Sequence, residues 1–143
     1  MQTFIRTGRQ KVAPHTMGVR VVLLTENADG PTGQRLATYG SLVDSHDDLD
    51  DAVGAVLGDR FGYDLFVMDC DGFGGIAGAE RAISALISGE AKMRVMLVSR
   101  EFDVPVYPLG RRTAVCLPED VSDASFRIGF DHVLRDRAAI TMN

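Results

Sequence analysis

The chain has 143 residues, a net charge of -5, 45% hydrophobic residues and 24% charged residues. This length suits one domain with its own core, and the composition is that of an ordinary soluble globular protein. The acidic balance disfavours general nucleic-acid binding, which needs a basic face. No apolar run reaches the length of a membrane span, and no apolar stretch follows the basic residues near the N-terminus. We therefore expect a cytoplasmic protein with no membrane segment.

Strands and helices alternate in the first half of the predicted domain, which covers residues 19–143 after an N-terminal extension at 1–18. A strand is predicted at 20–24, followed by a helix from Pro31 to about residue 39, since proline is favoured in a first helical turn. A weak strand at 41–45 precedes a second helix. Its acidic start at 47–51 suits the positive end of a helix dipole, and it should stop near Gly58.

The second half continues the alternation with a strand at 64–68, whose unbroken apolar run indicates a strand covered on both faces. We expect a turn at 72–75, a helix at 76–88 that buries Ile83, Leu86 and Ile87, and a strand at 94–98. Two prolines exclude a regular helix over 103–110. A short strand at 113–116 and a last helix, capped by Ser122 or Asp123, complete the pattern. The last helix has an apolar face made of Phe126, Phe130, Val133 and Leu134.

Polar residues stand where three of these strands end. Glu26, Asp69 and Ser99 follow or close the first, third and fourth strands, and Leu117 follows the last one. In an open parallel sheet, ligands bind outside the carboxyl ends of the strands, where the strand order reverses. We therefore expect Glu26, Asp69 and Ser99 to share one site.

Over residues 20–137 the chain resembles the receiver domain of two-component response regulators. Residues 20–27 resemble the family's first strand, which normally ends in two acidic residues and here has Thr25 and Glu26. Residues 64–69 resemble the third strand with its phosphoacceptor aspartate, Asp69. Residues 95–99 resemble the fourth strand with its hydroxyl residue, and 114–118 resemble the fifth, where Leu117 stands at the usual lysine position.

The resemblance implies an α/β, flavodoxin-like (βα)5 fold. Five parallel strands would form a doubly wound sheet in the order 2-1-3-4-5. The fourth helix should be shortened or lost around Pro105 and Pro108.

The resemblance also implies the site chemistry. Asp69 would be the phosphoacceptor, and Ser99 would contact a phosphoryl oxygen. Mg²⁺ would be held by Glu26, Asp69 and the backbone carbonyl of Asp71. Thr25 removes one acidic ligand, so metal binding should be weakened or lost. Leu117 cannot donate a hydrogen bond or carry a charge, so the usual readout of phosphorylation should be impaired.

The expected function is that of a stand-alone, atypical receiver-like module in two-component phosphorelay signalling, not an enzyme. It would act through protein–protein interaction, with weak or absent phosphorylation. The implied partners are a histidine kinase, a phosphotransfer protein or a downstream effector. A homodimer could form through the fourth strand, the fifth strand and the last helix, where Phe126, Phe130 and Tyr107 would add apolar area.

Two alternatives stay open. Asp69 could be a working Mg²⁺-dependent phosphoacceptor despite Leu117. The same crevice could instead belong to a flavodoxin-like small-molecule-binding protein, although the acidic loop at 25–29 would repel a flavin phosphate.

Overall fold

The computed structural model describes residues 18–108 and 114–142, with side chains described as far as residue 135. The predicted extension at 1–18 therefore lies, apart from Gly18, outside the described residues. A parallel sheet of five strands is present: β1 (Arg20–Leu24), β2 (Leu42–His46), β3 (Leu65–Asp69), β4 (Arg94–Ser99) and β5 (Val115–Pro118). Its order, β2-β1-β3-β4-β5, confirms the predicted doubly wound fold.

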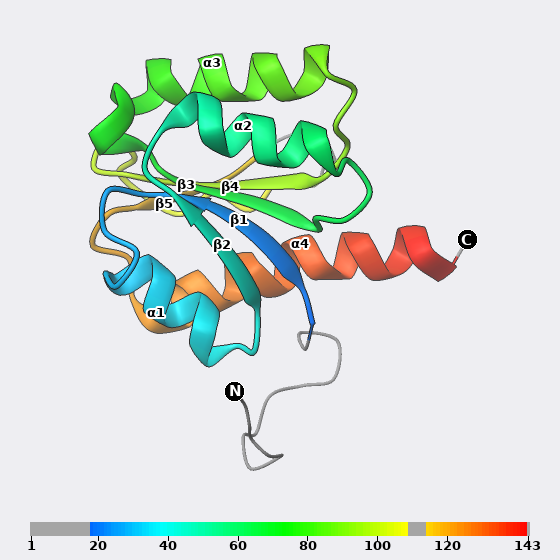
Figure 1. Ribbon diagram of the computed structural model, residues 1–143. Helices are drawn as coiled ribbons and strands as arrows, with labels where there is room; N and C mark the ends of the chain where they lie inside the picture. Colours follow the sequence, from blue (N-terminus) through cyan, green and yellow to red (C-terminus); the bar gives the residue numbers. More distant parts are fainter. Residues whose placement is uncertain (1–17, 109–113, 143) are drawn as a thin grey trace.

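Helices cover both faces of the sheet (Figure 1). One face carries α2 (Leu49–Gly58) and α3 (Gly75–Ser88), and the other carries α1 (Pro31–Thr38) and α4 (Asp123–Met142). Among the residues that the structure describes, no helix has both the length and the apolar character needed to cross a membrane.

The helices begin where local side chains favour it. Pro31 occupies the first turn of α1, as predicted. The Asp48 carboxylate accepts a hydrogen bond from the Asp51 amide (3.0 Å) and caps α2. The Ser122 hydroxyl accepts one from the Ser125 amide (3.1 Å) at the start of α4, which confirms Ser122 as a capping residue.

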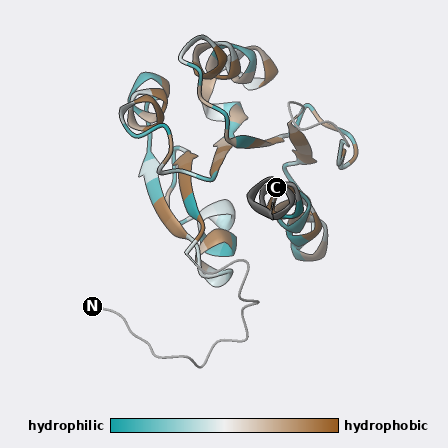
Figure 2. Cartoon of the chain, turned by 90° about the vertical axis from the view of Figure 1, so that its right-hand side faces the viewer, coloured by the Kyte–Doolittle hydropathy of each residue, from teal (hydrophilic) through white to brown (hydrophobic). Residues whose placement is uncertain are grey.

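The core is built on the central strands, where every residue from Val21 to Leu24 and from Leu65 to Met68 is buried. Figure 2 shows these hydrophobic residues along the strands between the two helix layers. On the α4 side, Phe126 and Phe130 are fully buried, and the Phe130 ring lies 4.8 Å from that of Tyr39. The predicted apolar face of the last helix is confirmed. The expectation that Phe126 and Phe130 add exposed area to an interaction surface is wrong, because they belong to the core.

Two further expectations are corrected. The fifth strand begins and ends two residues later than predicted, so Leu117 lies inside β5 and is fully buried. Ile87 is 66% exposed instead of facing inward, because Ala82 and Leu86 hold the buried positions of α3. The predicted turn at 72–75 is also more ordered than expected, since Cys70–Phe73 forms a 3-10 helix and Gly75 starts α3.

The connection between β4 and β5 is irregular over residues 100–108, the part of it that the structure describes. Residues 100–108 contain no helix, and Val106 forms an antiparallel bridge with Cys116 through two backbone hydrogen bonds of 2.8 and 3.1 Å. This agrees with the predicted loss of the fourth helix for the part of the segment that the structure describes; residues 109–113 lie outside it. The outer edge of β5 is therefore partly covered by its own connection.

Candidate functional site

A cavity of about 330 Å³ opens at the carboxyl ends of β1 and β3, where the strand order reverses. It is the pocket predicted from the strand ends, and it brings Glu26, Asp69 and Asp71 together. Ser99 adjoins this pocket through a hydrogen bond to Asp71. The complete lining is Thr25, Glu26, Asn27, Pro31, Thr32, Arg35, Asp69, Asp71, Gly72, Val98 and Glu119.

Both carboxylate oxygens of Asp69 accept hydrogen bonds from threonine hydroxyls. Thr25, just beyond β1, donates to Oδ2 (2.7 Å), and Thr32, in the first turn of α1, donates to Oδ1 (2.8 Å). Each threonine is only 5% exposed. Hydrogen bonds to an ionised acceptor are stronger than neutral ones, so these contacts fix the orientation of the carboxylate.

Thr25 also organises the loop that follows β1. Its hydroxyl oxygen accepts a hydrogen bond from the Asn27 amide (3.2 Å) while its hydroxyl hydrogen is directed at Asp69. Thr25, which occupies a position that is usually acidic in receiver domains, therefore donates a hydrogen bond to Asp69, the predicted phosphoacceptor. One side chain links the loop after β1 to the end of β3.

Asp71 accepts hydrogen bonds from a different set of partners, two of which lie at the end of β4. The Ser99 hydroxyl donates to Oδ1 (2.6 Å) and the Arg100 amide donates to Oδ2 (2.9 Å). The Arg100 guanidinium lies 4.0 Å from the same carboxylate. Burial raises the pKa of Asp71, but the hydrogen bonds from Ser99 and the Arg100 amide outweigh it, so the pKa lies below its ordinary value. The Ser99 hydroxyl was expected to contact a phosphoryl group. In this structure it donates its hydrogen bond to Asp71.

Glu26 reaches the pocket from the solvent side. A Cβ atom placed on Gly72 would lie 2.4 Å from the carboxyl carbon of Glu26, so this side chain lies directly over Gly72. A residue with a side chain at position 72 would have to displace Glu26. The glycine therefore permits the close approach of the β1 and β3 loops.

The predicted Mg²⁺ ligands are the carboxylates of Glu26 and Asp69 and the backbone carbonyl of Asp71. Among the described residues, no three histidine, cysteine, aspartate or glutamate side chains are arranged to hold a metal ion. The oxygens of Asp69 and Asp71 already accept hydrogen bonds from hydroxyl and amide donors. Each of these carboxylate oxygens accepts one hydrogen bond and keeps a second acceptor position, so the present donors do not exclude a metal ion. The Mg²⁺ site therefore stays a prediction.

The cationic side chain in the lining of the cavity is engaged elsewhere. Arg35 lines the cavity, but its guanidinium donates to Asp123 (2.7 Å) and to the Val121 carbonyl (2.9 Å). Leu117 packs in the core cluster that includes Phe126 and supplies no positive charge. The pocket is therefore lined by carboxylates and hydroxyls without an ammonium group from β5.

Cys70 directly follows Asp69 but adds no nucleophile. It is fully buried, and burial raises the pKa of its thiol to about 12. At neutral pH this thiol stays protonated. The chemistry of the pocket is therefore that of carboxylates and hydroxyls.

Sequence reasoning missed Thr32, Arg35 and Glu119 as pocket residues and did not assign a hydrogen bond to Thr25. The one available signal was position: Thr32 lies in the first turn of a helix that follows the loop at the switch point. No protein-family model matches this chain, and the curated proteins include no match to it either.

Proposed function

We propose that this chain is an atypical receiver-like module of two-component phosphorelay signalling that acts by protein–protein interaction. Phosphorylation of Asp69 is weak or absent, and the chain is not an enzyme. Its partner is a histidine kinase, a phosphotransfer protein or a downstream effector. A cytoplasmic location belongs to the same proposal.

The observation that carries the proposal is the state of Asp69. Each of its oxygens accepts a short hydrogen bond, from Thr25 at 2.7 Å and from Thr32 at 2.8 Å. Each oxygen keeps a second lone pair, but a hydrogen bond to a hydroxyl withdraws electron density from it and makes it a weaker nucleophile. This effect disfavours phosphoryl transfer to Asp69 without preventing the domain from folding or binding a partner.

The position of Leu117 supports the same conclusion. Phosphoryl transfer depends on cationic groups that neutralise the charge on the transferred oxygens. Leu117 is fully buried and apolar, and Arg35 is already paired with Asp123. A phosphoryl group on Asp69 would therefore lack the cation that the resemblance places at the end of β5.

A second candidate is a working Mg²⁺-dependent phosphoacceptor. It is favoured by one observation: Glu26, Asp69 and Asp71 line the same cavity. Mg²⁺ would then be held by the carboxylates of Glu26 and Asp69 and by the backbone carbonyl of Asp71. Tight Mg²⁺ binding that is lost in Asp69→Asn would support this candidate.

The deciding experiment is incubation with acetyl phosphate and Mg²⁺, followed by intact-mass measurement. We expect no adduct, or only a trace, under conditions that fully modify an active receiver domain. Asp69→Asn serves as the matched control, because it removes the acceptor and keeps the shape of the side chain. A stoichiometric adduct that disappears in Asp69→Asn would reject the proposal in favour of the second candidate.

The interaction part of the proposal has its own test. Binding to a purified histidine kinase or phosphotransfer protein, measured by calorimetry, should be the same for the native chain and for Asp69→Asn. Equal affinities would support phosphorylation-independent binding. Binding that requires both Asp69 and acetyl phosphate would contradict it.

A further inference from the structure

The strand β2 has an open edge. It is an end strand of the sheet, and among the residues that the structure describes its only neighbouring strand is β1 (Figure 1). The Leu42 amide donates a hydrogen bond to the Val19 carbonyl (2.8 Å), and the His46 carbonyl accepts one from the Thr25 amide (2.9 Å). Leu42 and His46 therefore direct these backbone groups toward β1.

The residues between them alternate in direction. In a parallel sheet, successive residues of a strand direct their N–H and C=O groups to opposite sides. Val43 and Ser45 therefore direct these groups away from β1, to the side where the sheet ends. Ser45 is exposed, and the Val43 side chain packs partly against the core. The edge thus offers two amides and two carbonyls to an extended chain.

Acidic side chains surround this edge. Residues 41–51 contain five aspartates, no lysine and no arginine. All five aspartates are exposed, and within the described part of the chain none of them forms a salt bridge. They are Asp44, Asp47, Asp48, Asp50 and Asp51. The nearby Arg20 guanidinium lies over the Tyr63 ring and is paired with Asp59 (3.1 Å). The edge therefore carries a negative charge that no ion pair neutralises.

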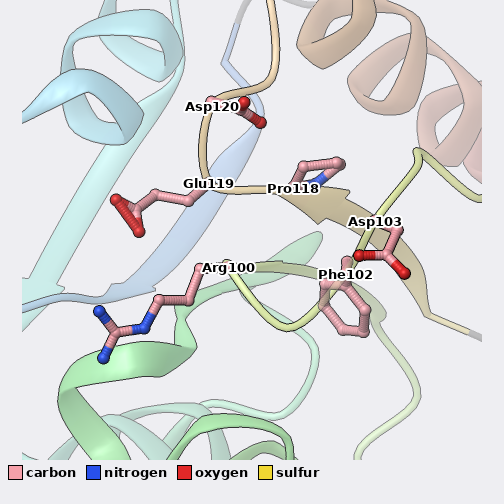
Figure 3. A pocket seen from close by; sticks show the side chains of 6 residues that line it. All are labelled: Arg100, Phe102, Asp103, Pro118, Glu119 and Asp120. Atoms are coloured by element: carbon pink, nitrogen blue, oxygen red, sulfur yellow. The ribbon is translucent and has the colours of Figure 1, made fainter.

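The acidic cavity beside the ends of β4 and β5 is different in this respect. It has a volume of about 390 Å³ and is lined by Arg100, Phe102, Asp103, Pro118, Glu119 and Asp120. In Figure 3 the Arg100 and Glu119 side chains extend in the same direction from the loops that follow the two strands. The lining of that cavity thus includes a cation, whereas the acidic stretch at 41–51 has none.

We propose that the open edge of β2 binds an extended, basic segment of another protein. The segment pairs with Val43 and Ser45 as a sixth strand, and its backbone hydrogen bonds supply the affinity. Lysine or arginine side chains beside the five aspartates select the partner, and an apolar side chain covers Leu42, which is 59% exposed. A second copy of this chain is disfavoured, because it would bring the same acidic residues to the same edge.

This inference goes beyond the proposed function. It does not involve Asp69 or the pocket, and it requires no two-component partner. Its basis is the direction of the backbone groups in β2 and the charge of residues 41–51.

The test is amide hydrogen exchange by NMR on the full chain. The probe is a synthetic ten-residue peptide in which lysine and arginine alternate with valine and threonine. At saturation we expect exchange of the Val43 and Ser45 amides to slow about tenfold or more, because each gains a hydrogen bond. The amides of Leu42 and Asp44 already face β1 and should change less. A purely electrostatic contact would not produce this alternation.

Controls separate backbone pairing from charge. A peptide that is N-methylated at every backbone amide keeps the charges and loses the donors, so its binding should be at least about tenfold weaker. Ser45→Pro removes one outward amide at a position where an edge strand tolerates proline, and it should also weaken binding about tenfold. Ser45→Ala is the matched control, because it keeps the amide. The methylated peptide tests the same bonds if Ser45→Pro fails to fold.

The charge requirement has a separate test. A peptide with glutamate in place of each lysine and arginine should not bind. Asp47→Asn should weaken binding of the basic peptide about threefold, as the loss of one exposed ion pair implies. Asp103→Asn is the matched control, because it lowers the net charge equally at a residue that lines the cavity beside β5.

Unchanged exchange at Val43 and Ser45 with the basic peptide at millimolar concentration would overturn the inference. Equal binding of the methylated peptide would also overturn it, because the contact would then be electrostatic alone. Slow exchange of both amides in the free chain would have the same meaning, since the edge would already be filled by this chain or by a second copy. An acetyl-phosphate adduct on Asp69 would reject the proposed function and leave all these outcomes unaffected.

Discussion

Asp69 and Asp71 are two residues apart and line one cavity. Their hydrogen-bond partners nevertheless lie on opposite sides of β3, near β1 for Asp69 and at the end of β4 for Asp71. Asp69 accepts side-chain hydroxyls from the β1 side, Thr25 and Thr32. Asp71 accepts a hydroxyl and a backbone amide from the β4 side. In the first case the neighbours fix the carboxylate. In the second the carboxylate fixes a neighbouring turn, so equivalent substitutions at the two positions should have different consequences.

Alanine at each position gives the largest contrast. Asp71→Ala leaves the buried Ser99 hydroxyl and the Arg100 amide without their acceptor, which should lower the free energy of unfolding by about 2 kcal/mol. Asp69→Ala frees two threonine hydroxyls, which can rotate toward other acceptors, so we expect a loss of about 1 kcal/mol. Urea denaturation of the two variants measures the difference. A larger loss for Asp69→Ala would reverse the comparison.

A smaller effect should come from Thr32→Val, which keeps the shape of the side chain and removes one donor to Asp69. We expect a loss of about 1 kcal/mol, because Thr32 is almost fully buried. Thr38→Val is the control on the same helix, since the exposed Thr38 hydroxyl only donates to the Gln34 carbonyl. Thermal unfolding should separate the two. If both variants unfold at the same temperature, the contact to Asp69 does not contribute to stability.

The smallest expected effect is a pH dependence that belongs to Asp71. Its pKa lies below the ordinary 3.8, because hydrogen bonds from Ser99 and the Arg100 amide outweigh the effect of burial. Ionised Asp71 therefore stabilises the folded state above that value, and this contribution is lost as the pH falls through the folded-state pKa. Between about pH 5 and about pH 3, the unfolding free energy of the native chain should fall more steeply than that of Asp71→Asn. Parallel curves would contradict the assignment.

The alternation of strands and helices predicted a parallel sheet, and the almost uninterrupted apolar runs predicted central strands that are covered on both faces. The strand order was implied by the resemblance. Asp69 was singled out because it closes one of these runs and because the resemblance places the phosphoacceptor there. Helix starts were readable from local residues such as Pro31, Asp48 and Ser122. These features depend on neighbours in the chain, so they need no knowledge of the tertiary structure.

The rest of the site depends on contacts between distant residues. Thr32 contacts Asp69 across 37 positions, and Ser99 contacts Asp71 across 28. From the sequence, a threonine in a first helical turn looks like an ordinary polar residue. Its role becomes visible only when the fold brings the start of α1 beside the end of β3. The burial of Phe126 and Phe130 was also not predictable from the sequence. Their spacing defined an apolar face, but only the packing of α4 on the sheet shows that it is completely covered.

The bridge between Val106 and Cys116 has a consequence for assembly. Both backbone groups of Cys116 that face away from β4 are already paired with Val106. Pro118, at the end of the same strand, has no amide hydrogen to offer. A strand from a second chain could pair with β5 only after displacing Val106. The connection between β4 and β5 therefore protects this edge of the sheet against strand addition.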